Sequence, residues 1–312
     1  MPFAEHHRII LTIPEPFHFS RTVAKPATWH WSTPEEMFHD GILWTGVYVG
    51  DVPLGLKMSA VKNKVNVTVF SDTVLTSKEL SLLQSTIWSG LGGDEDLAGF
   101  YQFARNDMLL SETIERLFGM RLATLDDVPG RTFLAILLQM APMKRSDQMI
   151  TALLHHFGNR IEFDGKMVIL WPRPRDLSSV DVDDLRKKAN LGYRAGRLIQ
   201  AARFLAETPI TLRSLSTLPE KEAIAELTRI PGVGEYSAGI ILGKTSLPLD
   251  VWSVVIMSEL VLGRTPENPR EAISGLISVL TERWGRWRWY AFVYLLNDLE
   301  NLSKTYRLSR IG

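Results

Sequence analysis

Two features of the segment from 224 to 252 could do chemistry: a Gly-Val-Gly turn and a single acid, Asp250. Apolar residues on both sides of the turn recur at helical spacing, so the pattern predicts a helix, a tight turn and a second helix. Gly232 and Gly234 can take positive φ and leave the backbone uncovered by side chains. Bare N–H groups at a helix amino terminus favour a phosphate. The alternative is a turn that only joins two helices.

Asp250 follows Pro248 and precedes the apolar run "VWSVVIMSELVLG", a position typical of a helix N-cap. Capping could be its whole role. A carboxylate at a helix amino terminus is also held ionised by the helix dipole and by backbone donors. Such an anion is suited to facing a positive charge that develops during a reaction, whereas a proton donor would require the opposite environment.

The elements that must position these residues are a sheet and a set of helices. Residues 8–71 have strand patterns, with Val65, Val67 and Val69 alternating with polar residues. From about residue 73 the period becomes helical, and the rest is predicted to be almost wholly helical, with an extended connection at Pro172 and Pro174. We therefore expect an α+β fold: a small antiparallel sheet domain with flanking helices over 1–96, and a larger all-α domain over 97–312 with the helix-hairpin-helix at about 220–243.

Composition excludes several classes of protein. The chain has 312 residues, of which 45% are apolar and 22% charged, as expected for a globular protein of more than one domain. Its 35 basic residues balance 35 acidic ones, so contact with nucleic acid must be local. The absence of cysteine excludes disulfides, thiolate catalysis and Cys-based metal sites. With no signal peptide or spanning segment evident, we expect a cytoplasmic, intracellular protein, nucleoid-associated if the source is prokaryotic, and a monomer.

Several segments together resemble one family. The run "IPGVGEYSAGIIL" followed by "LPLDVWSVV" is similar to the hairpin, Gly/Pro-rich loop and aspartate of the helix-hairpin-helix (HhH-GPD) DNA glycosylase superfamily. Upstream, "NLGYRAGRLIQAARFL" and "FLAILLQMAPMKRSDQMITALLHHFG" resemble the 3-methyladenine and 8-oxoguanine branches, and "TWHWS" with "GILWTGVYVG" resembles their amino-terminal sheet domain. The resemblance covers most of the chain and is strongest from about 132 to 255.

The resemblance implies a base-excision-repair enzyme whose partner is double-stranded DNA containing a damaged base. Such enzymes flip the damaged nucleotide out of the duplex and cleave the bond between base and sugar. Asp250 matches their catalytic aspartate, which would stabilise oxocarbenium-like charge on the sugar and orient or deprotonate the attacking water.

The residue at position 236 bears on whether the enzyme also cuts the strand. Family members with lyase activity carry a lysine there, which forms a Schiff base with the sugar, and this chain has Tyr236. Lys244 lies too far along the second helix to replace it. The resemblance therefore implies a monofunctional glycosylase. Tyr236 could stack on a flipped, electron-poor base, or it could only pack within the hairpin.

The resemblance also assigns contacts with DNA. Met140 matches an apolar wedge that fills the gap left by the extruded base, although a core methionine is the alternative. Gln139 is expected to line the lesion, and Trp252 either lines the pocket or packs in the core. The backbone N–H groups of the hairpin are expected to bind phosphate, with a possible Na⁺ or K⁺ on its carbonyl oxygens and no other cofactor or side-chain metal site. The hairpin residues concerned are Gly232, Val233 and Gly234.

Substrate class is open among three interpretations. Alkylated purines such as 3-methyladenine or 7-methylguanine are favoured. An 8-oxoguanine-type enzyme is the second, but Pro26 in "KPATWHW" stands where those enzymes present a glycine, and a proline cannot offer the same N–H. The third is an inactive protein that only binds lesions. The Arg- and Trp-rich run "ERWGRWRWYAF" is expected to pack in the core rather than to bind single strands.

Overall fold

The five strands of the amino-terminal sheet form where the sequence alternates. The computed structural model describes residues 2–24, 37–122, 124–125, 127–141, 143–243 and 247–311. The strands are all antiparallel in the order β1-β5-β4-β3-β2, and Val65, Val67 and Val69 are buried on one face, as predicted. Their bounds are β1 Ala4–Thr12, β2 Met37–His39, β3 Ile42–Val49, β4 Val52–Val61 and β5 Lys64–Ser71.

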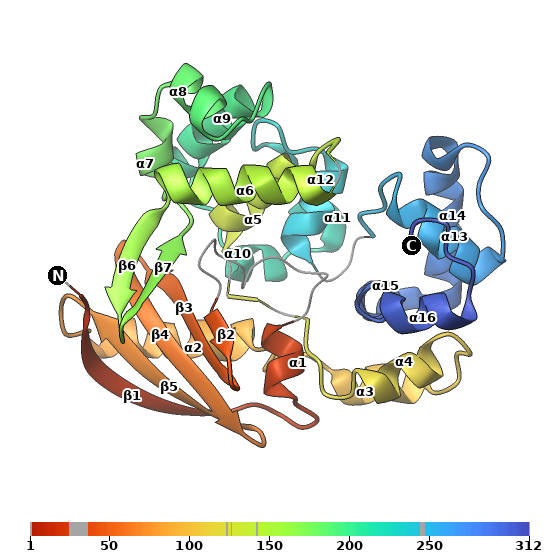
Figure 1. Cartoon of the computed structure of the whole chain (residues 1–312), viewed down its shortest axis with the longest axis horizontal. Helices are drawn as coiled ribbons and strands as arrows, with labels where there is room; N and C mark the ends of the chain where they lie inside the picture. Colours follow the sequence, from red (N-terminus) through yellow and green to blue (C-terminus); the bar gives the residue numbers. More distant parts are fainter. Residues whose placement is uncertain are drawn as a thin grey trace.

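Helix α2 (Ser77–Gly90) covers this face of the sheet (Figure 1). It begins with a capping box, in which Thr76 and Glu79 exchange hydrogen bonds between side chain and backbone. Leu83 and Ile87, one turn apart, are fully buried against the strands. The short helix α1 (Phe19–Val23) contributes to the same core.

A second hairpin packs on the opposite face of the sheet, where the sequence had been predicted to be helical. Strands β6 (Asn159–Phe163) and β7 (Lys166–Leu170) are joined by Asp164-Gly165, both at positive φ, which is the hairpin signal that the helical prediction missed. Gly46 and Gly55 are paired across β3 and β4, and a Cβ on either would overlap side chains of the hairpin. These glycines therefore admit a segment from the second half of the chain onto the sheet.

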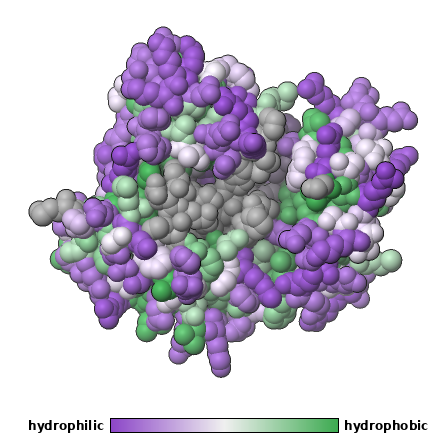
Figure 2. All heavy atoms as spheres, viewed as in Figure 1, coloured by the Kyte–Doolittle hydropathy of each residue, from purple (hydrophilic) through white to green (hydrophobic). Residues whose placement is uncertain are grey.

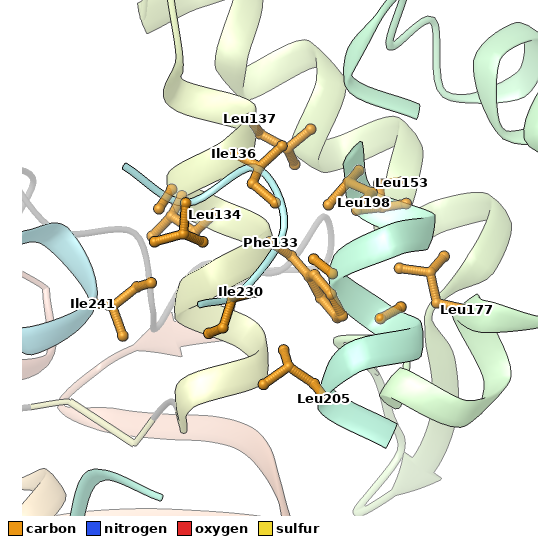
Figure 3. Packing of buried hydrophobic residues seen from close by; sticks show 14 of the residues in the cluster. Phe133, Leu134, Ile136, Leu137, Leu153, Leu177, Leu198, Leu205, Ile230 and Ile241 are labelled. Atoms are coloured by element: carbon orange, nitrogen blue, oxygen red, sulfur yellow. The ribbon is translucent and has the colours of Figure 1, made fainter. Parts of the chain in front are cut away.

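The first group of helices surrounds a core that includes Phe133, Leu198 and Ile230 (Figure 3). Helix α7 begins at Pro174, where an extended connection had been predicted, because proline is well tolerated in the first turn of a helix. Helix α5 runs from Val128 to Leu138. The group comprises α5 Val128–Leu138, α6 Met143–Phe157, α7 Pro174–Ser178, α8 Val182–Lys188, α9 Arg194–Glu207, α10 Leu212–Ser216, α11 Glu220–Thr228 and α12 Glu235–Leu242. Hydrophilic residues cover the outer side of α8 and α9 (Figure 2).

A second group of helices joins two segments that are distant in sequence. Helices α3 and α4 pack against the four carboxy-terminal helices (Figure 1). Asp298, 1% exposed, accepts hydrogen bonds from Thr113 and Arg116 and so ties the two segments together. The bounds are α3 Leu97–Ala104, α4 Leu110–Arg116, α13 Ser253–Leu262, α14 Pro269–Trp284, α15 Arg288–Asn297 and α16 Leu299–Thr305, with a 3₁₀ turn at Gly285–Trp287.

The Arg- and Trp-rich run lies in this second group, and several of its side chains are paired with other residues of the protein. Trp284 is buried and its indole N–H donates to Asp107, which also accepts from Arg283. Arg288 pairs with Glu220 of α11, in the first group of helices. The prediction that this run packs in the protein is confirmed. The antiparallel sheet and the two groups of helices also confirm the predicted α+β fold class.

Candidate active site

The Gly-Val-Gly turn lies between α11 and α12, as predicted. Gly232 has φ of +86°, a conformation that side chains rarely adopt, whereas Gly234 is extended with φ of −99°. Val233 between them is only 6% exposed and belongs to the core of the first helix group. Its side chain anchors the turn, and its N–H donates to the carbonyl oxygen of Ile230 at 3.0 Å.

The bare donors of the hairpin are therefore those on either side of Val233. The N–H of Val233 is used within the turn, so the expectation that it binds phosphate is not supported by the geometry. The N–H groups of Gly232 and Gly234 donate to no other residue in the described ranges. A Cβ on Gly234 would meet nothing within 4 Å, so its backbone is open to solvent at the start of α12. An anion can approach these donors directly.

Asp250 caps the first turn of α13 through one of its two carboxylate oxygens. Oδ1 accepts the backbone N–H of Ser253 and its hydroxyl, each at 2.7 Å, and the N–H of Trp252 at 3.1 Å. The hydrogen bonds expected of a capping residue are present, although α13 begins at Ser253 with Trp252 at its N-cap position. Oδ2 accepts no hydrogen bond from any residue that the structure describes, so the half-buried carboxylate is fixed by one oxygen and keeps the other available.

Tyr236 brings the hairpin and the acid together. It lies in the first turn of α12, and burial raises the pKa of its hydroxyl above the ordinary value, with the negative charge of Asp250 raising it further. The phenol therefore stays neutral, and the electrostatic effect of Asp250 on its pKa places the two side chains near each other. Helix α12 itself is held by Arg131, whose guanidinium donates to the carbonyl oxygen of Ile241 at 2.9 Å.

A shallow groove of about 660 Å³ runs along the hairpin. Met140 lies at its edge with 78% of its surface exposed, which excludes the alternative of a core methionine. Asp250 and Trp252 do not line this groove, so it is a surface beside the acid rather than a pocket around it. Its lining comprises Gln139, Met140, Arg197, Gln200, Thr228, Ile230, Pro231, Gly232, Val233, Gly234, Tyr236 and Ser237.

The remaining two predicted pocket residues have contacts within the protein. Gln139 ends α5, and its amide nitrogen donates to the carbonyl oxygen of Gly232 at 2.8 Å. Trp252 is half-buried against the second helix group, as its packing alternative predicted. The structure therefore brings Gln139, Met140 and Tyr236 together at the hairpin, and it places Trp252 beside Asp250.

Three residues near the groove belong to a segment that resembles the family, but the sequence assigned them no role in the site. Tyr193, which is 50% exposed, has the guanidinium groups of Arg194 and Arg197 over its ring at 4.6 and 4.7 Å. Their signal was present in "GYRAGR", because residues three apart share a helix face. Rigid aromatic and cationic side chains beside bare backbone donors suit a surface that contacts nucleic acid.

Three of the sequence predictions concern residues that the structure does not describe. Pro26, the "TWHWS" segment and Lys244 lie outside the residues that it describes. Among the described residues, no three His, Cys, Asp or Glu side chains are grouped so that they could hold a metal ion. No helix in the described ranges combines the length and apolar character needed to cross a bilayer.

Comparison with known proteins gives the same fold. No family model matches the chain. It is 23% identical over 302 residues to the DNA-3-methyladenine glycosylase of Bacillus subtilis (strain 168), covering 92% of this chain and 95% of the relative. The 3-methyladenine DNA glycosylase of Archaeoglobus fulgidus superposes with a TM-score of 0.75 at 16% identity, over 94% of this chain and 99% of that one.

An oxidised-base enzyme has an equally similar structure. The 8-oxoguanine glycosylase/lyase of Clostridium acetobutylicum, solved with double-stranded DNA, superposes with a TM-score of 0.71 at 18% identity. This likeness covers 97% of the present chain and all of the other. The resemblance to helix-hairpin-helix DNA glycosylases, including the 3-methyladenine and 8-oxoguanine branches, is thus confirmed, and the chain has their fold.

Proposed function

We propose that this protein is a monofunctional DNA glycosylase that removes alkylated purines from double-stranded DNA. One observation carries the proposal: the carboxylate of Asp250 is fixed beside a helix amino terminus, and it lies close enough to Tyr236 of the hairpin to raise the pKa of that phenol. A phosphate-binding turn and a single oriented acid are what hydrolysis of an N-glycosidic bond requires. The turn would hold the strand while the acid acts on the sugar.

The chemistry would be done by the free oxygen of Asp250. Its partner Oδ1 is held by two N–H groups and a hydroxyl, which fixes the direction of the carboxylate. The negative oxygen would stabilise positive charge on the sugar as the base leaves, and it would orient the water that attacks C1′. Such an anion, already oriented before the reaction, needs no reorganisation as the charge develops.

The lack of lyase activity follows from the side chain at position 236. A Schiff base requires an amine, and the phenol of Tyr236, kept neutral by burial, offers none. Its aromatic ring would instead stack on a flipped base. Cationic alkylated purines would gain most from such stacking, because the face of an aromatic ring attracts positive charge. The likeness to the alkylation-repair relative supports this preference.

The partner would be double-stranded DNA containing a damaged base, bound along the hairpin by a monomer of the protein. The N–H groups of Gly232 and Gly234 would hold the phosphate, and Met140 would enter the space left by the base. Because its substrate is genomic DNA, the protein would act in the cytoplasm, at the nucleoid in a prokaryote.

A monovalent cation at the hairpin is a further part of the proposal. The carbonyl oxygens of Ile230 and Gly232 accept hydrogen bonds from Val233 and Gln139, and a carbonyl oxygen has a second lone pair. The turn can therefore offer oxygen ligands of the kind that Na⁺ and K⁺ prefer. A cation held there would add positive charge beside the bound phosphate.

A panel of duplexes, each with one damaged base, tests the proposed function. Release of 3-methyladenine or 7-methylguanine, with strand breaks appearing only after alkali, is the expected result. Breaks without alkali would contradict the monofunctional assignment. Release of 8-oxoguanine in preference to alkylated purines would favour the second candidate, which the structural likeness to the 8-oxoguanine enzyme supports. Binding without release of any base would show a lesion-binding protein.

A further inference from the structure

Met140 has a backbone conformation that the chain must hold in place. Its φ is +50°, in the left-handed region that costs free energy for any residue other than glycine, and it follows directly on the end of α5. Its side chain is 78% exposed, so burial of the side chain does not stabilise this conformation. Strained backbone of this kind persists only where neighbouring contacts fix it.

The neighbouring contacts converge on Gln139, the residue before Met140. Its carbonyl oxygen accepts a hydrogen bond from the buried guanidinium of Arg194 and one from the hydroxyl of Tyr193 at 3.4 Å. Its side-chain oxygen accepts from Arg197 at 2.7 Å. The residue that precedes the exposed methionine is thus held on both its backbone and its side chain by α9 and the loop before it.

The side chain of Gln139 also reaches the hairpin. Its amide nitrogen donates to the carbonyl oxygen of Gly232 at 2.8 Å and to the hydroxyl of Ser237 at 3.0 Å. Gly232 is the residue at positive φ in the turn, and Ser237 lies in the first turn of α12 beyond Tyr236. A single carboxamide therefore connects the segment that carries Met140 to the turn with the bare N–H groups.

We propose that Gln139 is a positioning residue that couples two events: the insertion of Met140 into DNA and the binding of the strand by the hairpin. The inference rests on the proposed function. When the hairpin binds a phosphate, the two hydrogen bonds from Gln139 fix the height and direction of Met140 relative to that strand. Without them, the segment of Met140 would lose its direct link to the hairpin, while Arg194 and Tyr193 would still bind the carbonyl oxygen of Gln139.

The structure also separates this role from a role in folding. The hairpin is anchored by Val233, Ile230 and Ile241, which are buried in the core of the first helix group. Gln139 is only half-buried and is not part of that core. Its removal should therefore leave the hairpin folded while breaking the link between the hairpin and the segment of Met140.

The test uses a duplex with a stable abasic-site analogue opposite 2-aminopurine, whose fluorescence rises when it is unstacked. Gln139→Ala removes the carboxamide, and Gln139→Glu keeps its length and its acceptor for Arg197 but removes both donors. Gln102→Ala, on the exposed side of α3, is the matched control for loss of a carboxamide. Met140→Ala shows how much of the fluorescence increase depends on the side chain of Met140. All variants are compared at saturating protein, with binding measured separately by anisotropy.

We expect both Gln139 variants to bind the duplex and melt within a few degrees of the wild type, with the unstacked population reduced about tenfold, the scale of two net hydrogen bonds. Ser237→Ala, which removes one of the two acceptors, should give an intermediate loss. Base release from duplex DNA should fall in parallel, while release from a single-stranded substrate, which has no stack to fill, should not change.

Other outcomes would overturn the proposal. A Gln139→Glu protein with wild-type fluorescence would show that the two donors to the hairpin are not needed. Equal losses from duplex and single-stranded substrates would indicate a general structural role. If the wild type unstacks the probe and the Gln139 variants do not, but no base is released from any lesion, the proposed function fails while the coupling stands. If the wild type releases bases and Gln139→Ala does so equally well, the coupling fails and the function stands.

Discussion

The carboxylate of Asp250 raises the pKa of the Tyr236 phenol, although the two residues belong to segments of different helix groups. Tyr236 belongs to the first turn of α12 in one helix group, and Asp250 precedes α13 in the other. The negative charge of Asp250 helps to raise the pKa of Tyr236, which requires the two groups to be near each other. The site therefore lies where the two groups of helices meet.

Replacement of Asp250 by Asn tests the catalytic assignment. Asn caps helices about as well as Asp, so the hydrogen bonds that Oδ1 accepts should persist and the protein should remain folded. The loss of negative charge should reduce base release by about a thousandfold or more, because an oriented anion is a large part of transition-state stabilisation. Single-turnover base release on the best substrate measures the effect. Near-normal turnover with unchanged melting would show that Asp250 acts only as a cap.

The pH dependence of stability tests the environment of Tyr236. Because burial raises the folded-state pKa of this phenol, the fold gains stability from its protonated form at pH values below the ordinary phenol pKa of about 10. That contribution should be lost progressively as the pH rises above about 10. Tyr236→Phe lacks the ionisable group, so its free energy of unfolding should fall less steeply there than that of the wild type. Urea unfolding at pH 8 and pH 10.5 makes the comparison, and parallel curves for the two proteins would contradict a buried phenol beside Asp250.

Met140 offers a substitution whose effects on stability and on activity should diverge. Met140→Gly relieves the positive φ of +50° and removes a side chain that is 78% exposed, so the melting temperature should not fall. Base release from duplex DNA should fall by about tenfold or more, because no side chain then fills the gap left by the base. Thermal melting and duplex kinetics check the two effects. A large loss of stability would indicate that Met140 packs inside the protein, and unchanged kinetics would show that it is not the wedge.

The sequence predicted those parts of the site that depend on neighbouring residues. The turn at Gly232 and the cap at Asp250 were read from short local patterns, and both were found in the structure. The α+β class was likewise read from a change of hydrophobic period near residue 73. In these cases, spacing along the chain determines local geometry almost directly.

The parts that were missed depend on contacts between distant segments. Strands β6 and β7 pack on the sheet only because Gly46 and Gly55 leave space for them, which no local pattern reveals. The network around Gln139 combines residues near 139, 193 to 197 and 232 to 237. The Asp-Gly pair between β6 and β7 is a sequence signal for a hairpin turn, but the helical prediction for this region gave it no weight.

The two glycines of the hairpin provide a matched pair of substitutions. At Gly232, φ is +86° and a Cβ would lie 3.2 Å from Cβ of Arg197, so Gly232→Ala should lower the free energy of unfolding by about 1 to 2 kcal/mol. At Gly234, φ is −99° and a Cβ would meet nothing, so Gly234→Ala should leave stability nearly unchanged. If phosphate binds the bare backbone, the methyl group of Gly234→Ala should nevertheless weaken affinity for duplex DNA severalfold. Urea unfolding and fluorescence anisotropy with labelled duplex measure the two quantities. A Gly234→Ala protein with full affinity for DNA would mean that the strand does not contact the turn at this point.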